Sequence, residues 1–283
     1  MAALSFRIVN VFTRGQGALT GNPLCVFESG AGLNTALMQG IARQFNLSET
    51  TFILPSSRAD AQVRIFTPTY EMPFAGHPTL GTAHVCRALK LGSDSLRLEM
   101  PAGVIAVQAS GNRWTLTAPP SSARELDVPR GALASALGLE ERDIGDRPLW
   151  IKAGKEQLVV PLTSADAVGR AAPQPKALQE IRSEDGNCMA YVFALQGANA
   201  ALARFFFPQG PAVLEDPATG SATANFGGWW LAMQRPLPAE LQISQGELIG
   251  RPSSLYLTVT AQRQIFVGGD VLEIGRGTID ISD

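Results

Sequence analysis

The sequence has few of the residues that bind metals or form disulfides. Its 283 residues include only two histidines, His77 and His84, and three cysteines, Cys25, Cys86 and Cys188. There is no Cys-x-x-Cys pair and no His/Cys cluster at metal-ligand spacing, so we expect neither a metal site nor a disulfide framework. Widely spaced cysteines in odd number favour a reducing compartment, which predicts a cytoplasmic protein.

Other patterns are also missing. The chain has no run of Lys and Arg and a formal net charge of −2, which argues against nucleic acid or a membrane surface as the partner. Its apolar runs are too short to span a bilayer, and Met1 to Asn10 does not have the pattern of a secretion signal. No Gly-x-Gly-x-x-Gly or Walker-type segment is present, so no nucleotide cofactor is implied. We expect no cofactor and a small-molecule partner.

What the sequence does contain is an internal repeat. The hexapeptide Pro78 to Ala83 returns as Pro217 to Ala222, and each copy opens a strongly apolar helical stretch. With 45% hydrophobic residues the chain has material for two cores. A helix that is apolar on most sides is a buried one. The repeat predicts an α+β fold with two similar lobes, each a barrel-like sheet around a central helix, with a cleft between them.

The elements follow the same order in both halves. Residues 6–12 and 23–27 predict an opening hairpin, followed by a helix that Asn34 caps and that ends near Phe45, and by a strand over residues 50–54. The second half repeats this order with a strand over 157–162, a helix over 176–182 and a strand over 188–195. Pro and Ser residues break all periodicity over 118–131, which places the crossover there.

The two helix starts are candidate ligand sites. The segment Glu71 to Thr79 combines small residues with the free amides and positive dipole end of a helix, which suit a carboxylate. A capped strand-to-helix turn explains the segment equally well. Aligned on the hexapeptides, Asp216 occupies the position of His77, and this difference favours chemistry, although Asp is also an ordinary helix cap. Ser221 has no evident His/Asp relay and reads as a capping hydroxyl.

Glu49 is the candidate acid or base. It lies between Leu47 and Phe52 in uncharged surroundings, and the other half has no acid near the aligned position, Ala190. A carboxyl group in apolar surroundings can transfer protons near neutral pH. A solvated loop glutamate is the competing interpretation.

Five segments in order resemble the phenazine-biosynthesis isomerase family, PhzF-like, over nearly the whole chain. They are Thr20 to Leu24, Asn46 to Phe52, Glu71 to Gly81, Asp216 to Ala222 and Gln245 to Ser253. The resemblance implies the diaminopimelate-epimerase-type fold, with an N-terminal lobe over 1–118, completed by a last strand over about 270–283, and a C-terminal lobe over 131–269. The active site would lie in the cleft between the lobes.

The resemblance also implies roles for residues. Glu49 matches the family's acid/base glutamate, and His77 and Asp216 would position or polarise the substrate. Substrate-binding positions are Asn22, Gly76, Gly220 and Ser221. The characterised member of the family isomerises trans-2,3-dihydro-3-hydroxyanthranilate without a metal or an organic cofactor, and many members have no assigned reaction. Dimers are common in the family, so a homodimer is an expectation.

Alternatives remain at this point. Related cofactor-free epimerases and racemases use one cysteine at each helix start, and neither start has one here. An epimerase or lyase on the same scaffold would use Glu49 with Asp216 as opposed acid and base. A binding protein without turnover is the third alternative, because a fold does not imply a function.

Overall fold

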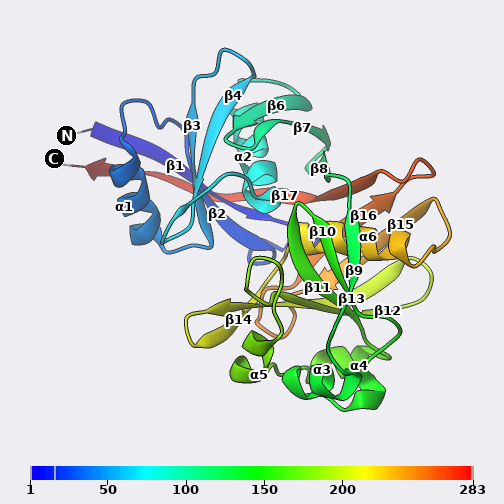
Figure 1. Ribbon diagram of the computed structural model, residues 1–283. Coiled ribbons are helices and arrows are strands. Elements are labelled where there is room, and N and C mark those ends of the chain that lie inside the picture. The colour runs from blue at the N-terminus through cyan, green and yellow to red at the C-terminus, as the bar shows by residue number, and fades with distance from the viewer. Residues whose placement is uncertain (1, 16, 282–283) are drawn as a thin grey trace. The chain divides into compact units, whose positions relative to one another are not determined.

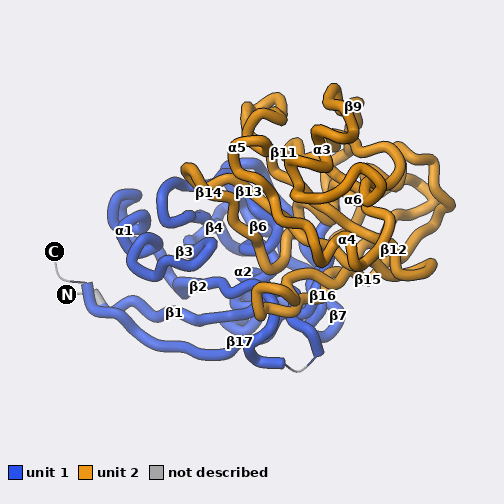
Figure 2. Tube along the Cα trace, turned by 90° about the horizontal axis from the view of Figure 1, so that it is seen from below, with its two compact units in different colours: residues 1–117, 268–283 blue, residues 118–267 orange. Residues whose placement is uncertain are grey.

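The chain forms two compact units in the computed structural model, which describes residues 2–15 and 17–281 (Figures 1 and 2). Unit 1 comprises residues 1–117 and 268–283, and unit 2 comprises residues 118–267. The last strand, β17 (Ile265–Ile281), begins in unit 2 and continues through unit 1. Figure 2 shows it running beside β1, with which it pairs in antiparallel fashion.

Among the described residues, eight strands of unit 1 close into a barrel. Their order is β1-β2-β3-β4-β6-β7-β8-β17, and the pairing of β17 with β1 completes the ring. The pairs β2–β3 and β4–β6 are parallel. The short strand β5 (Glu71–Met72) forms a hairpin with β4. The other bounds are β1 Ala2–Val11, β2 Asn22–Phe27, β3 Glu49–Leu54, β4 Ala61–Phe66, β6 Ser95–Met100, β7 Gly103–Ser110 and β8 Arg113–Thr117.

The barrel encloses helix α2 (Gly76–Ala88). This helix contacts β1, β2, β3, β4, β6 and β8, and its residues 77–86 are buried with the exception of His84. Gly81 allows the close approach, because a Cβ atom there would lie 2.6 Å from Leu24 Cδ2. Helix α1 (Thr35–Phe45) packs on the other face of the sheet, and Asn34 caps it by accepting a hydrogen bond from the Leu37 amide.

Unit 2 repeats this strand order around helix α6 (Gly220–Ala232). Its strands pair in the order β9-β10-β11-β12-β13-β15-β16, and β11–β12 and β13–β15 are the parallel pairs. The strand β14 forms a hairpin with β13, as β5 does with β4. The bounds are β9 Ser122–Glu125, β10 Leu149–Ala153, β11 Lys155–Pro161, β12 Ala190–Leu195, β13 Ala200–Gln209, β14 Ala212–Asp216, β15 Ala239–Gln245 and β16 Ser253–Val259.

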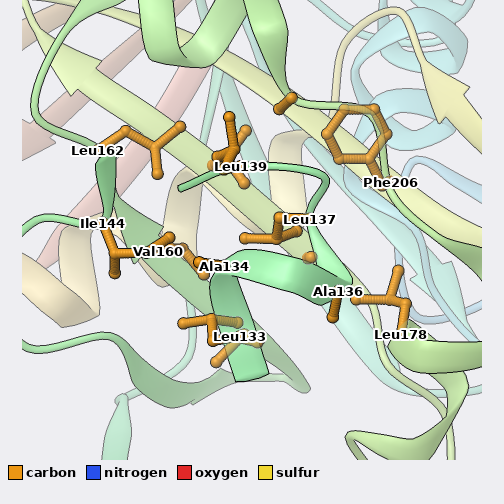
Figure 3. Packing of buried hydrophobic residues seen from close by; sticks show 14 of the residues in the cluster. Leu133, Ala134, Ala136, Leu137, Leu139, Ile144, Val160, Leu162, Leu178 and Phe206 are labelled. Atoms are coloured by element: carbon orange, nitrogen blue, oxygen red, sulfur yellow. The ribbon is translucent and has the colours of Figure 1, made fainter. Parts of the chain in front are cut away.

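The outer helices of unit 2 cover a second apolar cluster. These are α3 (Arg130–Ala136), the 3-10 turn η1 (Glu141–Asp143), α4 (Ala165–Arg170) and α5 (Pro175–Glu180). Figure 3 shows Leu133 and Leu137, from α3 and its end, packed with Val160 of β11 and Leu178 of α5. This cluster lies apart from α6, whose aromatic residues form their own core with Phe193.

The predicted elements are largely confirmed. The opening hairpin pairs β1 with β2, and α1 begins after its Asn34 cap and ends at Phe45 as expected. The α+β fold with a barrel around a central helix is confirmed as well. One correction concerns residues 118–131, which read as loop but contain β9, and β9 pairs with β10. Its exposed polar residues follow no apolar alternation, so the pattern has no strand signal.

The strand registers show which residues of the two units are equivalent. Phe66 pairs with Glu71 in unit 1 as Phe206 pairs with Glu215 in unit 2. The central helices then begin at Gly76 and Gly220, the fifth residue after each glutamate. These registers, with those of the parallel pairs, give eight equivalences: Leu24 and Gln157, Glu49 and Met189, Met72 and Asp216, Ala75 and Thr219, Gly76 and Gly220, His77 and Ser221, Gly81 and Asn225, and Met100 and Gln245.

The hexapeptide alignment is therefore wrong by five residues, because Pro217 corresponds to Pro73 and not to Pro78. His77 is equivalent to Ser221, whereas Asp216 is equivalent to Met72. The misalignment has a physical cause. A helix inside a small barrel needs small residues on many of its turns, so Gly, Ala, Ser and Thr match at several offsets.

Candidate active site

Glu49 and His77 lie side by side in unit 1. Glu49 is the first residue of β3, and His77 is the second residue of α2. Glu49 Oε2 lies 3.0 Å from His77 Nδ1, and the two side chains are 17% and 7% exposed. The structure thus brings together a carboxylate and an imidazole that are 28 positions apart in the sequence (77 − 49).

This pair retains hydrogen-bonding capacity. Within the described part of the chain, the buried atoms Glu49 Oε2 and His77 Nε2 have no hydrogen-bond partner. The contact between Oε2 and Nδ1 has the distance of an ion pair but not the alignment of a hydrogen bond. Buried polar atoms are rarely left in this state, and a catalytic role is one of the few explanations for them. Together the two groups can accept, hold and donate a proton.

The N terminus of α2 adds backbone donors beside this pair. Ala75 precedes the helix in extended conformation and makes no side-chain capping bond. The first amides, those of Gly76 and His77, have no acceptor within the helix, and Pro78 has no N–H group. The positive end of the helix dipole lies at the same place. These donors suit a carboxylate or an oxygen that gains negative charge during a reaction.

Asn22 belongs to the same end of the barrel. It is the first residue of β2 and is buried. Leu24, two residues further, is the register partner of Glu49. Because alternate residues of a strand share a face, Asn22 lies on the face of β2 that carries Leu24. The predicted substrate-binding position is therefore built into unit 1 beside the Glu49 strand.

In unit 2, Asp216 is held by a polar cluster. Its Oδ2 accepts a hydrogen bond of 2.5 Å from Thr219 Oγ1, and Thr219 is the cap residue of α6. Gln245, at the end of β15, donates from Nε2 to the Asp216 carbonyl at 2.8 Å and to Thr219 Oγ1 at 3.1 Å, and its Oε1 accepts from the Thr219 amide at 3.4 Å. The equivalent residues of unit 1 are Met72, Ala75 and Met100. The whole polar set is thus specific to unit 2.

A second polar cluster reaches Ser221, the second residue of α6. Ser221 Oγ accepts a hydrogen bond of 3.0 Å from Gln157 Nε2, and Gln157 Oε1 accepts one of 2.7 Å from Asn225 Nδ2. Gly220 opens the helix and is buried. Ser221, which read as a simple helix-capping hydroxyl, is not the cap, since that residue is Thr219.

Sequence reasoning missed three buried amides, Gln157, Asn225 and Gln245. Gln245 lies in the segment Gln245 to Ser253, which resembles the family, but the resemblance assigns it no role. Gln157 and Asn225 lie in apolar stretches of sequence, which predict core positions. All three are almost fully buried. A lone amide inside an apolar strand or helix was the available signal, because buried polar groups need dedicated partners.

A family model describes the same chain. The model of the phenazine biosynthesis-like proteins, PhzC-PhzF, matches residues 9–271. The chain belongs to this family. An uncharacterized isomerase of Pasteurella multocida is 37% identical over 279 residues, which cover 97% of this chain and 93% of that protein. The trans-2,3-dihydro-3-hydroxyanthranilate isomerase of Pseudomonas chlororaphis is 35% identical over 287 residues, covering 96% and 98%.

Solved structures agree with this membership. The crystal structure of a PhzF-family phenazine biosynthesis protein from Bacillus anthracis matches with a TM-score of 0.87 and 25% identity, over 99% of this chain and all of that one. The predicted resemblance is confirmed, and the PhzF-like chain is an enzyme of the isomerase type.

The cysteines of this PhzF-like chain belong to neither helix start. Cys86 is near the far end of α2, Cys25 is in β2, and Cys188 precedes β12. All three thiols are free and buried, and burial raises their pKa values, for Cys86 and Cys188 to about 12. Thiols held in the neutral form are poor proton acceptors. The two helix starts therefore offer no pair of thiols for proton transfer.

The second histidine has a structural place in unit 1. His84 Nδ1 accepts a hydrogen bond of 3.4 Å from Trp114 Nε1. Desolvation, with the nearby Arg87, lowers the pKa of His84 to about 4, so the ring is neutral at physiological pH.

Within residues 2–15 and 17–281 there is no group of three His, Cys, Asp or Glu side chains that could hold a metal ion. No helix in those ranges has the length and apolarity that a membrane span needs.

Proposed function

We propose that this PhzF-like chain is a cofactor-independent isomerase that moves a hydrogen within a small carboxylated metabolite. The substrate is cyclic or unsaturated, and Glu49 transfers the proton. The observation that carries the proposal is the partly buried Glu49–His77 pair at the N terminus of α2, where a carboxylate able to exchange a proton adjoins backbone donors. The 35% identical hydroxyanthranilate isomerase supports the same class of substrate.

In the proposed step, the Glu49 carboxylate removes a C–H proton from one carbon of the substrate. The electron pair shifts through the neighbouring double bonds, and the protonated Glu49 returns the proton to another carbon. Atoms and charge are conserved, so the step needs no external oxidant or reductant. His77, whose Nδ1 lies 3.0 Å from Glu49 Oε2, orients the carboxylate.

We assign Asn22 and Gly76 of unit 1, and Asp216, Gly220 and Ser221 of unit 2, to substrate binding. Their support is structural. A Cβ atom on Gly76 would meet only Leu116 Cδ2, at 3.7 Å, so packing inside unit 1 does not require glycine there. Asp216 is fixed by Thr219 and Gln245, as a residue that must present its carboxylate in one orientation would be.

The test is proton NMR of trans-2,3-dihydro-3-hydroxyanthranilate in heavy water, with the wild type and with Glu49→Gln. We expect product with deuterium at the new C–H position, and a rate lower by a factor of about 10² to 10⁴ in the variant. Glu240→Gln, an exposed glutamate outside both helix starts, is the matched control and should keep the wild-type rate.

Two outcomes would contradict the proposal. Equal rates for the wild type and Glu49→Gln would remove Glu49 from the chemistry. No turnover by the wild type would exclude this compound as the substrate. It would favour another carboxylated metabolite as the substrate, or a binding protein without turnover.

A further inference from the structure

A chain of hydrogen bonds leads from the backbone of unit 2 to Ser221. The Ala153 amide donates to Asn225 Oδ1 at 2.7 Å. Asn225 Nδ2 donates to the Lys155 carbonyl at 3.0 Å and to Gln157 Oε1 at 2.7 Å. Gln157 Nε2 then donates to Ser221 Oγ at 3.0 Å.

The direction of this chain is fixed by its backbone end. A backbone N–H can only donate, and a backbone carbonyl can only accept. The Asn225 side chain must therefore place its oxygen toward Ala153 and its NH₂ group toward Lys155 and Gln157. Gln157 must in turn place its oxygen toward Asn225 and its NH₂ group toward Ser221. The serine hydroxyl is left to accept this bond.

Ser221 consequently keeps its O–H for a hydrogen bond to a ligand. Its oxygen already accepts from Gln157, and it makes no other hydrogen bond with the described residues, so its O–H is available. Asn225 and Gln157 are 0% and 2% exposed, whereas Ser221 is only partly buried. The buried end of the hydrogen-bond chain, at Asn225, is thus fixed, and the Ser221 hydroxyl lies at its accessible end.

The fold does not require this chain of hydrogen bonds. In unit 1 the equivalents of Gln157, Asn225 and Ser221 are Leu24, Gly81 and His77, and no amide is present at either strand or helix position. The same helix packs inside a similar sheet there, with Leu24 closing over Gly81. Two buried amides that the architecture can replace by apolar residues point to a role in the site.

We propose that Gln157 and Asn225 are positioning residues that hold Ser221 as a hydrogen-bond donor. The substrate group that receives the bond from the Ser221 O–H is then an acceptor, a carboxylate or carbonyl oxygen. This inference rests on the proposed function insofar as Ser221 touches the substrate. It adds a direction to that contact and names the two residues that set it.

The decisive variant is Gln157→Glu, which keeps the shape of the side chain. When ionised, the introduced carboxyl group can only accept, so Ser221 must donate inward and is lost to the ligand. When protonated, the carboxyl group donates to Ser221 and restores the original direction. Burial raises the pKa of such a group, which brings the transition toward neutral pH.

The measurement is the Kd of 3-hydroxyanthranilate, a stable aromatic carboxylate, by calorimetry between pH 5 and pH 8. Relative to the wild type at each pH, we expect the Kd of Gln157→Glu to be about tenfold higher at pH 8 and nearly equal at pH 5. Ser221→Ala and Gln157→Leu should each raise the Kd about tenfold at every pH, and the double variant should be no worse than either. Gln242→Glu, at an exposed position of β15, is the matched control and should follow the wild type.

A purely structural role gives a different pattern. It would lower the melting temperature of the Gln157 variants, leave the Kd ratio independent of pH, and make the two single losses additive. That result, or no binding by the wild type, overturns the inference. If the wild type binds the carboxylate with the expected pH dependence in Gln157→Glu but turns over no substrate, the proposed reaction fails and the inference stands.

The hydrogen-bond chain can also be tested without a ligand. The side-chain NH₂ signals of Gln157 and Asn225 should exchange slowly with solvent in the wild type, and that of Gln157 should exchange faster in Ser221→Ala. Rapid exchange of the Gln157 signal in the wild type would show that the chain is not formed, and would overturn the inference directly.

Discussion

Gln245 holds Thr219 from both sides, since its Nε2 donates to the threonine hydroxyl at 3.1 Å and its Oε1 accepts from the threonine amide at 3.4 Å. The hydroxyl in turn donates to Asp216. One buried amide therefore closes the turn between β14 and α6 and fixes the carboxylate at its start. The equivalent residue of unit 1 is Met100, so this turn can be built without an amide, and the amide sets the position of Asp216.

We expect Gln245→Met to lower both stability and activity. The change leaves the Asp216 carbonyl and the Thr219 amide without their partner inside unit 2, which costs about 1 to 3 kcal/mol of unfolding free energy. Urea unfolding measures this loss, and steady-state kinetics should show a larger fall in kcat than in substrate affinity, because the carboxylate stays but is no longer fixed. Unchanged kinetics with reduced stability would limit Gln245 to a structural role.

Rebuilding the unit 1 arrangement separates these two effects. The triple variant Asp216→Met, Thr219→Ala, Gln245→Met contains the three residues that unit 1 uses at these positions. We expect it to regain part of the stability that Gln245→Met loses, since the side chains at these three positions are then all apolar and only the two backbone groups still lack the bonds of Gln245, and to show no turnover. A triple variant less stable than the single one would show that the turn of unit 2 depends on its polar residues.

Much of the fold follows from patterns that a sequence displays. The Asn34 cap, the apolar spacing that ends at Phe45 and the opening hairpin over residues 6–12 and 23–27 are local signals, and the structure confirms them. The apolar nature of residues 79–86 and of the stretch after Thr219 predicts helices enclosed by a sheet, and this is what α2 and α6 are.

The relation between the halves could not be read from short matches. Equivalence in a barrel is defined by strand register, and only the pairing of Phe66 with Glu71 and of Phe206 with Glu215 shows that Ser221 corresponds to His77. Gln157 and Asn225 were equally hidden. Each has an apolar or small counterpart in unit 1, and its role depends on a partner 64 or more positions away in sequence or on a strand backbone.

Gly81 should not tolerate a methyl group, whereas Gly40 should. A Cβ atom on Gly81 would lie 2.6 Å from Leu24 Cδ2 and 2.9 Å from Val11 Cγ2, inside the closed barrel. We expect Gly81→Ala to cost about 1 to 3 kcal/mol of unfolding free energy. Gly40 lies in α1 with open space around it, so Gly40→Ala should add about 0.5 to 1 kcal/mol. Denaturant unfolding of both variants tests the pair, and equal effects would contradict the close approach of α2 to β1 and β2.

Native protein should resist thiol reagents. Cys25, Cys86 and Cys188 are buried, and burial raises their pKa values, so little thiolate is present near neutral pH. Iodoacetamide at pH 7.5 should leave activity unchanged and label no cysteine within the time that labels all three in urea, as read by mass spectrometry. Rapid loss of activity with labelling of one cysteine would assign that thiol to the reaction and contradict proton transfer by Glu49 alone.

The stability of the chain should fall below neutral pH because of His84. Its folded-state pKa, lowered to about 4 by burial and by the nearby Arg87, lies below the ordinary value of 6.5. The unfolded state therefore binds more protons between these values, so the contribution is complete above pH 6.5 and is lost as the pH falls toward 4. Allowing for the partial exposure of the ring, we expect a loss of about 2 kcal/mol across this window.

His84→Gln keeps an acceptor for Trp114 Nε1 but cannot titrate, so urea unfolding of the wild type and the variant at several pH values isolates the effect. Carboxylates with lowered pKa values, such as Glu156, act in both proteins and cancel in the difference. Parallel stability curves for the two proteins would show that His84 is not the group responsible.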